Sequence, residues 1–66
     1  MQIFLNGESR ELSQNGTIST LLAELDLTNK RLAVEVNLNI VPRSQFDTYQ
    51  LTEGDKIEIV QAIGGG

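Results

Sequence analysis

The 66-residue chain contains neither cysteine nor histidine. These absences exclude a disulfide, a thiolate nucleophile, a histidine base and a zinc site built from such residues. A domain this small buries only about 60% of the surface that its unfolded chain exposes. Its stability must therefore come from one compact apolar core, and 39% hydrophobic residues are compatible with a globular domain.

Basic charge is also scarce, because five lysines and arginines stand against nine acidic residues and give a net charge of -4. The basic residues are scattered along the chain at Arg10, Lys30, Arg31, Arg43 and Lys56. Binding to a phosphate backbone relies on concentrated basic charge. We therefore expect neither nucleic acid nor an anionic membrane as a partner, and a basic protein surface fits better.

Long hydrophobic runs are missing as well. No apolar stretch approaches the roughly 20 residues that span a bilayer, and the N-terminus lacks the hydrophobic region of a signal peptide. We expect a soluble, cytoplasmic protein.

The first half of the chain has the pattern of a hairpin followed by a helix. Residues 1–6 are typical of a strand, Asn6-Gly7 of a type I′ turn, and residues 8–13 of the returning strand. Thr17 is a predicted helix N-cap. The apolar residues after it recur at helical spacing, at Ile18, Leu21, Leu22 and Leu25. The end of this helix is marked only by Asp26 and Asn29, so its position is predicted to within several residues.

The second half predicts three further strands. Residues 32–37 alternate with period two, which places Leu32, Val34 and Val36 on one face. Ile40-Val41 before Pro42 suits a short edge strand. Residues 43–49 are irregular or form one helical turn with Phe46 in the core, residues 53–55 form a turn, and residues 56–63 form the last strand.

The order hairpin, helix, strand, short strand and final strand predicts an α+β fold of two layers. The right-handed crossover rule places the strand after the helix parallel to one strand of the hairpin. This is the β-grasp, or ubiquitin-like, arrangement, a mixed sheet of four to five strands packed against one main helix. We expect a β-grasp domain over residues 1–63 and a flexible glycine tail over residues 64–66.

Three consecutive glycines end the chain, Gly64, Gly65 and Gly66. Average glycine usage is roughly 7%, and a glycine tail is thin, mobile and suited to a narrow channel in another protein. A frayed end or a remnant of expression is the plainer explanation.

The last strand also predicts a docking face beside the tail. If Ile57 and Ile59 point at the helix, Glu58, Val60 and Ala62 lie on the opposite face of the sheet, together with Phe4. These four residues are candidates for partner docking, although scattered apolar residues on a surface need no such explanation.

Carboxylates offer the other candidate chemistry. Asp47, Glu53, Asp55 and Glu58 could serve acid–base or metal roles. Most lie in predicted turns or on an exposed strand face, so we expect them to be solvated and to complement a basic partner. We predict no metal site. No phosphate-cradling loop is present either, because Gly7 and Gly16 are isolated, and we expect no independent enzyme.

Several segments of the chain have to be considered together: Met1-Gln2-Ile3, Thr17-Ile18 with Leu21-Leu22, the Asn-x-x-Ile-Val-Pro-Arg segment of residues 37–43, Gly54-Asp55, and the terminal Gly65-Gly66. With these segments the chain resembles a known family, the sulfur carrier proteins of thiamin thiazole biosynthesis. The resemblance covers the whole chain. Gly64 is a departure, since a larger small residue is equally familiar there.

The resemblance implies a protein cosubstrate with no bound cofactor. An adenylyltransferase-type activating enzyme would use ATP to adenylate the Gly66 carboxylate, and sulfur from a persulfide protein would displace AMP. The resulting thiocarboxylate would donate sulfur to a thiazole synthase. Gly64 and Gly65 would thread the terminus into each partner.

Two alternatives remain open at this point. The sulfur-donating small subunit of molybdopterin synthase looks similar in fold and in its Gly-Gly end, but it is usually longer. A ubiquitin-like interaction module with incidental glycines is the other.

Overall fold

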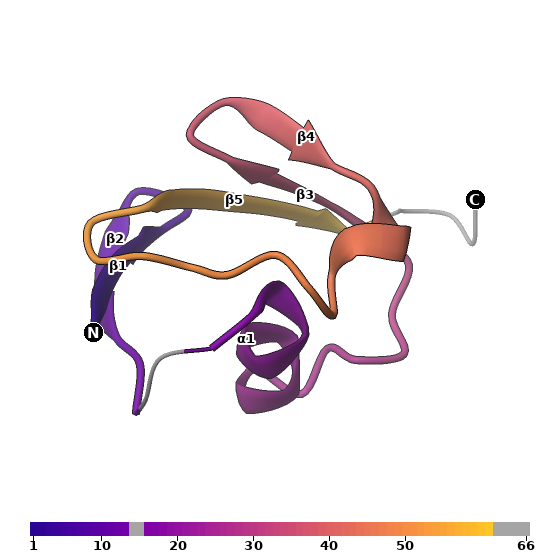
Figure 1. The fold of residues 1–66 in the computed structure, drawn as a ribbon, viewed down its shortest axis with the longest axis horizontal. Coiled ribbons are helices and arrows are strands. Elements are labelled where there is room, and N and C mark those ends of the chain that lie inside the picture. The colour runs from indigo at the N-terminus through magenta and orange to yellow at the C-terminus, as the bar shows by residue number, and fades with distance from the viewer. Residues whose placement is uncertain (14–15, 62–66) are drawn as a thin grey trace.

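Five strands form one sheet, and a single helix covers one face of it (Figure 1). The computed structural model describes residues 1–13 and 16–61. Its elements are β1 (Gln2–Leu5), β2 (Glu8–Glu11), α1 (Ile18–Glu24), β3 (Leu32–Val36), β4 (Asn39–Val41), a 3₁₀ helix (Arg43–Gln45) and β5 (Lys56–Gln61). The α+β class and the β-grasp arrangement are confirmed.

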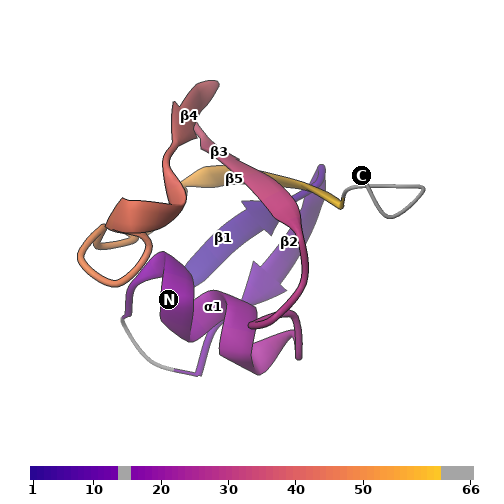
Figure 2. The ribbon, with the colours of Figure 1, turned by 90° about the vertical axis from the view of Figure 1, so that its right-hand side faces the viewer.

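The strand order is β2-β1-β5-β3-β4, so the last strand lies at the centre of the sheet. β5 is parallel to β1 and antiparallel to β3, as Figure 2 shows in the view along the sheet. β3 thus has the direction of the hairpin strand β2, as predicted. It does not pair with the hairpin, because β5 lies between them, and the parallel pair is β1 with β5.

α1 begins where the sequence predicted. Thr17 is the N-cap, and its side-chain oxygen accepts a hydrogen bond from the Thr20 amide. This bond satisfies one of the amides that an α-helix leaves without an internal partner at its start. The helix ends at Glu24, and Asp26 follows in the left-handed region at a φ of 60°. Asp26 therefore marks the end, and Asn29 lies beyond it.

The core lies between α1 and the inner face of the sheet. Helix residues Ile18 and Leu21 are fully buried, and Leu22 is 3% exposed. Phe46 follows the 3₁₀ helix and is buried, which confirms its predicted place in the core. The other buried apolar residues are Ile3, Leu12, Val34, Val36, Val41, Leu51 and Ile57.

Two tight turns with the same backbone pattern connect the hairpins. Asn6 and Gly7 have φ values of 50° and 85°, and the predicted turn between β1 and β2 is confirmed. Asn37 and Leu38, with φ values of 51° and 72°, join β3 to β4 in the same way. Two central residues with positive φ are the pattern of a type I′ turn. The sequence did not predict the second turn, because leucine is not a turn residue.

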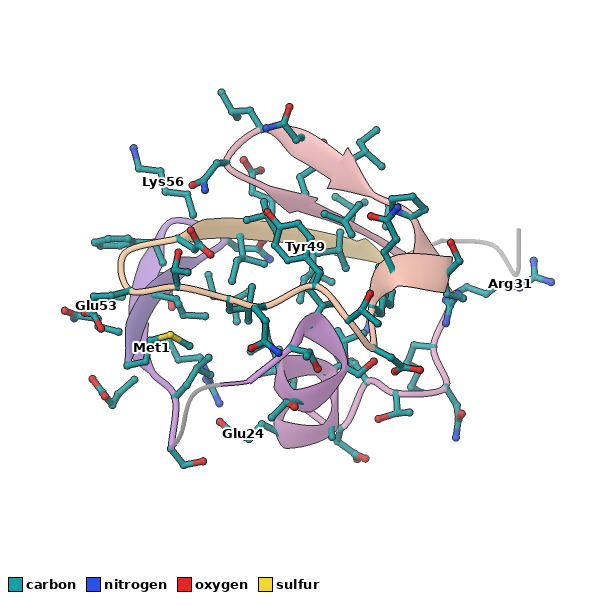
Figure 3. All side chains as sticks on the ribbon, in the orientation of Figure 1. Met1, Glu24, Arg31, Tyr49, Glu53 and Lys56 are labelled. Atoms are coloured by element: carbon teal, nitrogen blue, oxygen red, sulfur yellow. The ribbon has the colours of Figure 1, made fainter. Side chains whose placement is uncertain are left out.

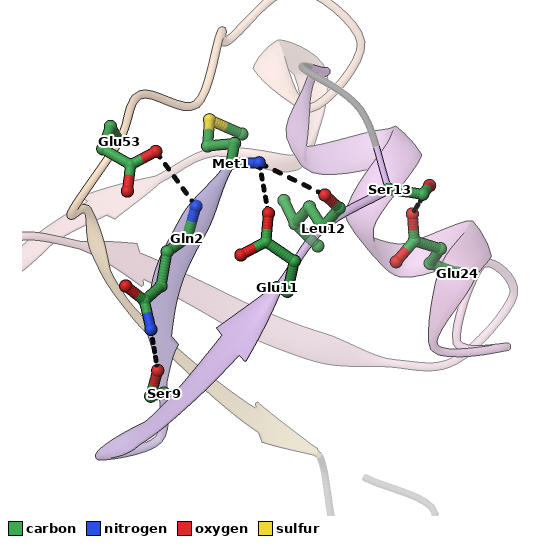
Figure 4. A network of polar contacts seen from close by, with 8 residues as sticks. All are labelled: Met1, Gln2, Ser9, Glu11, Leu12, Ser13, Glu24 and Glu53. Carbon is green, nitrogen blue, oxygen red and sulfur yellow. Dashed lines mark hydrogen bonds and ion pairs between the residues drawn. The ribbon is translucent and has the colours of Figure 1, made fainter.

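A polar network ties the N-terminus to the hairpin and to a distant loop (Figure 4). The Met1 amine lies 2.7 Å from a carboxylate oxygen of Glu11 and also donates to the Leu12 carbonyl. The Gln2 amide donates to the Glu53 side chain at 3.0 Å, and the Gln2 side chain donates to Ser9. The hydrogen bond to Glu11 is the main cause that raises the pKa of the Met1 amine above 8.0.

Strand ends differ from the expected bounds by one or two residues. β1 lacks Met1 and Asn6, and β2 ends at Glu11 although residues 8–13 were expected. Leu12 lies just beyond β2, where its amide donates to the Met1 carbonyl at 2.8 Å and its side chain is 3% exposed in the core. β5 is described to Gln61, so residues 62–63 and the predicted boundary before the tail lie outside the described residues.

Candidate functional site

β5 is the element that leads toward the terminal glycines. It pairs with β1 on one side and with β3 along its whole described length on the other, from Val36↔Ile57 to Leu32↔Gln61. A central strand has its backbone groups paired on both sides, which makes it one of the least mobile parts of a sheet. The pairing with β1 covers only Lys56 and Ile57, so the ladder on that side of β5 ends there.

Asn6 extends the pairing of β5 beyond the end of β1. Its backbone amide donates to the Ile57 carbonyl at 2.8 Å. Its side-chain oxygen accepts from the Ile59 amide at 2.8 Å, and its side-chain nitrogen donates to the Ile59 carbonyl at 3.3 Å. The Asn6 side chain therefore takes the place of a further strand residue and holds β5 two residues before Gln61.

Asn37 holds the other end of β5. Its side-chain oxygen accepts from the Lys56 amide, and its side-chain nitrogen donates to the Asp55 carboxylate, both at 3.0 Å. The Asp55 carboxylate also accepts from the amide and the hydroxyl of Thr52. The expectation that Asp55 is solvated is therefore wrong, since it is only 7% exposed and its hydrogen bonds lie within the fold.

The outer face of the sheet carries the predicted docking residues. Ile57 is buried toward α1, and Phe4, Glu58 and Val60 are exposed on the side away from the helix. Figure 3 shows Lys56 projecting on this same side. Ala62 lies outside the described residues.

These residues form a strip along β5 instead of one cluster. Phe4 pairs with Lys56 across the parallel strands, and Val60 pairs with Ala33. Positions 56 and 60 are four residues apart, which corresponds to about 13 Å along the strand. Glu58 lies between them, so a carboxylate separates the two apolar side chains.

Two open hollows flank the end of β5, and Val60 and Gln61 line both. The hollow beside β3 measures about 370 Å³, and the one beside the end of α1 about 610 Å³. Leu5, Leu25 and Leu27 line the larger hollow, so apolar surface borders the point where the described chain ends.

The fold brings together three basic residues that the sequence analysis treated as scattered. A guanidinium nitrogen of Arg43 donates to the Lys30 carbonyl at 3.0 Å, and Arg31 and Arg43 both line the smaller hollow. The Arg43 guanidinium also lies 5.7 Å from the centre of the Phe46 ring. Arg31 and Arg43 therefore border the end of the described part of β5, in a chain of net negative charge.

A metal site and a membrane-spanning helix are both absent from the part of the chain that the structure describes. Residues 1–13 and 16–61 contain no group of three or more acidic, histidine or cysteine residues arranged to hold a metal ion. Within the same ranges, no helix is long and apolar enough to cross a membrane. Gly64, Gly65 and Gly66 lie outside the described residues.

Comparison with known proteins decides the family. The model of the ThiS family matches residues 3–66. The chain belongs to the ThiS family. The resemblance found in the sequence is therefore confirmed.

Relatives of the ThiS family differ in length. The sulfur carrier protein ThiS of Bacillus subtilis is 40% identical over 63 residues, which cover 94% of this chain and 96% of that protein. A thiazole synthase of Paramagnetospirillum magneticum is 46% identical over 66 residues, which are all of this chain and 20% of the synthase. The chain thus spans about a fifth of the length of that relative.

A solved structure of a ThiS protein has a similar fold. The crystal structure of the thiamine biosynthesis protein ThiS from Geobacter metallireducens matches with a TM-score of 0.85 at 26% identity, over the whole of both chains. Sequence reasoning found which face of β5 points at the helix. It missed Asn6 and Asn37 as supports of β5, because their side-chain partners depend on which strands lie side by side.

Proposed function

We propose that this protein is a sulfur carrier of thiamin biosynthesis whose working group is the Gly66 carboxylate. The observation that supports this most strongly is the ThiS family match, which runs to residue 66 and includes the terminal Gly65-Gly66 pair. The protein acts as a cosubstrate of other enzymes and supplies no catalytic group of its own.

The chemistry requires activation, because a carboxylate is a poor electrophile. A Gly66 carboxylate oxygen attacks the α-phosphorus of ATP on the activating enzyme and releases pyrophosphate. The terminal sulfur of a persulfide protein then attacks the acyl adenylate and expels AMP. A second thiol cleaves the acyl disulfide, which frees the thiocarboxylate for a thiazole synthase.

The glycines suit this role for a steric reason. A terminal glycine leaves the carbonyl carbon unhindered, and Gly64 and Gly65 carry no Cβ that would meet the wall of a narrow channel. Three extended residues reach about 10 Å. The domain can therefore stay outside a partner while its terminus reaches the reacting centre.

The domain supplies recognition through its outer face. Phe4, Glu58 and Val60, with Ala62 beyond them, dock on the activating enzyme beside the channel that takes the tail. An apolar strip interrupted by a carboxylate fits a partner with apolar and basic groups at matching places.

The thiazole synthase is the proposed acceptor of the sulfur. A relative named thiazole synthase contains a region that aligns with the whole of this chain. Two parts that work in sequence gain effective concentration when they share one chain. No comparable observation favours molybdopterin synthase or an interaction module.

The adenylation step can be tested by exchange of labelled pyrophosphate into ATP. The activating enzyme should catalyse exchange only when the carrier is present, because the acyl adenylate is the species that returns pyrophosphate to ATP. A carrier without Gly65 and Gly66 should support none, while its melting temperature stays unchanged. Equal exchange with the truncated carrier would contradict the proposal.

A further inference from the structure

Leu38 occupies a backbone position that disfavours leucine. It has a φ of 72° in the turn between β3 and β4, and its side chain is 83% exposed. The corresponding residue of the other turn is Gly7, with a φ of 85°. A residue with a Cβ is strained in the left-handed region, whereas glycine is not. Contacts within the described domain do not bury Leu38, so they give no reason for a leucine there.

A second exposed apolar side chain lies beside this turn. Ile40 in β4 is 73% exposed and pairs with Glu35 of β3. Glu35 lies between the buried residues Val34 and Val36, so Glu35 and Ile40 both lie on the outer face. Figure 1 shows the β3–β4 hairpin standing on the side of β5 away from α1. Leu38 and Ile40 thus extend the outer face beyond β5.

Two like charges meet at the centre of the same face. Glu35 of β3 is directly opposite Glu58 of β5. Like charges at opposite positions of neighbouring strands destabilise a sheet. The salt bridge found among the described residues lies elsewhere, between the Met1 amine and Glu11. A lysine or arginine of a partner placed over Glu35 and Glu58 would relieve their repulsion.

We propose that Leu38, Ile40, Glu35 and Glu58 form a hairpin docking surface for the activating enzyme. The enzyme receives Leu38 in an apolar recess and places a lysine or arginine against the two carboxylates. This inference rests on the proposed function and extends its docking face from β5 to the β3–β4 hairpin.

The activating enzyme is the occupant because it meets the carrier first. A terminal glycine carboxylate is a common chemical group, so this enzyme must distinguish the carrier by its domain. A thiazole synthase meets a thiocarboxylate, which is itself distinctive. In the relative from Paramagnetospirillum magneticum the carrier-like region and the synthase share one chain, and shared chains need little docking affinity.

The hairpin docking surface lies at the opposite end of β5 from the tail. Leu38 comes two residues after Val36, which pairs with Ile57, whereas the described part of β5 ends at Gln61. These ends are separated by about 13–17 Å along the strand. A contact at Leu38 and a tail held in the channel fix the domain at two distant points, which sets its orientation on the enzyme.

The test uses a substitution that separates binding from folding. Leu38→Gly removes the anchor and gives the turn its preferred residue, so the melting temperature should stay unchanged or rise. The KM of the full-length carrier in the adenylation reaction should rise about tenfold, since a buried leucine contributes that much or more to affinity. The kcat should stay the same, because the tail is unaltered.

Matched variants at the same position sharpen the result. Leu38→Asn keeps a residue that tolerates positive φ but is polar, and it should raise KM as Leu38→Gly does. Leu38→Met keeps an apolar anchor and should have a KM close to that of the wild type.

The carboxylates of the hairpin docking surface have a test of their own. Glu35→Gln should raise KM severalfold and weaken its dependence on salt.

Other outcomes overturn the inference. A wild-type KM in both Leu38→Gly and Leu38→Asn would remove Leu38 from the interface. Weaker binding to thiazole synthase with unchanged adenylation would make the synthase the occupant and contradict the assignment. If the wild-type carrier is not adenylated at all, the proposed function itself fails.

Discussion

Two asparagine side chains give the central strand hydrogen bonds beyond those of strand pairing. Asn6 and Asn37 both have positive φ, and each uses its amide group to bind the backbone of β5. Asparagine tolerates this conformation and also offers a donor and an acceptor on a short side chain. The same residue type therefore forms each turn and supports the strand that carries the tail.

Replacing Asn6 with glycine should separate these two roles. Glycine keeps the positive φ of the turn but removes both bonds to Ile59, so stability should fall by about 1–2 kcal/mol. Hydrogen exchange should accelerate at the Ile59 amide more than at Val36 or Val34. Asn6→Asp keeps the acceptor for Ile59 and should be intermediate. Unchanged exchange at Ile59 in Asn6→Gly would show that the side chain does not hold β5.

The Met1 amine gives the hairpin a dependence on pH. Its pKa is raised from 8.0, chiefly by the hydrogen bond to Glu11; desolvation opposes this, and the charges of Glu11 and Glu53 add to the rise. A raised pKa means that the charged amine stabilises the fold below pH 8.0, and that this stability is lost as pH rises through the raised value. Unfolding experiments from pH 7 to 11 should show this decline.

Glu11→Gln provides the control for the amine. The pKa of Met1, followed by NMR, should move down toward 8.0 in this variant, and the decline in stability should shrink. An amine pKa that is the same in both proteins would mean that Glu11 does not bind it in solution.

At the scale of elements, α1 has only seven residues, Ile18–Glu24. An isolated helix of this length is not stable in water. It is held by burial of Ile18, Leu21 and Leu22 and by the cap at Thr17. These are the features that the sequence predicted, because helical spacing and an N-cap are local patterns.

Loss of a core side chain of α1 should cost more stability than loss of its N-cap. Leu21→Ala removes a fully buried side chain and should cost about 2–5 kcal/mol, while Thr17→Ala should cost about 1 kcal/mol. A domain of this size has a total stability of roughly 3–10 kcal/mol. Thermal unfolding should therefore show Leu21→Ala as the far less stable variant. Equal losses would mean that burial of Leu21 stabilises the fold no more than the cap does.

The sequence predicted the pattern within each element better than the relations between elements. The turn at Asn6-Gly7 and the inward residues of β3 followed from local chemistry. The partners of β3, the burial of Asp55 and the opposition of Glu35 and Glu58 depend on strand order and register, which local patterns do not specify. Leu38 gave no turn signal, because its conformation is imposed by the pairing of Val36 with Asn39.

At the scale of the whole molecule, the fold combines a rigid β5 with a terminus that carries the proposed chemistry. The outer face presents apolar side chains around Glu35 and Glu58, while Arg31 and Arg43 border the end of β5. A partner that covers both regions must complement opposite charges. This arrangement fits recognition of the whole domain together with its tail, and the tail by itself would lack such specificity.

The central claim is that Gly66 carries sulfur as a thiocarboxylate. Its most direct test is the intact mass of the carrier after incubation with ATP, the activating enzyme, a persulfide donor and a thiol. We expect a gain of about 16 Da, the replacement of one oxygen by sulfur, located by fragmentation in the peptide that ends at Gly66. An unchanged mass under conditions in which the enzyme consumes ATP, or a gain located elsewhere in the chain, would contradict the account.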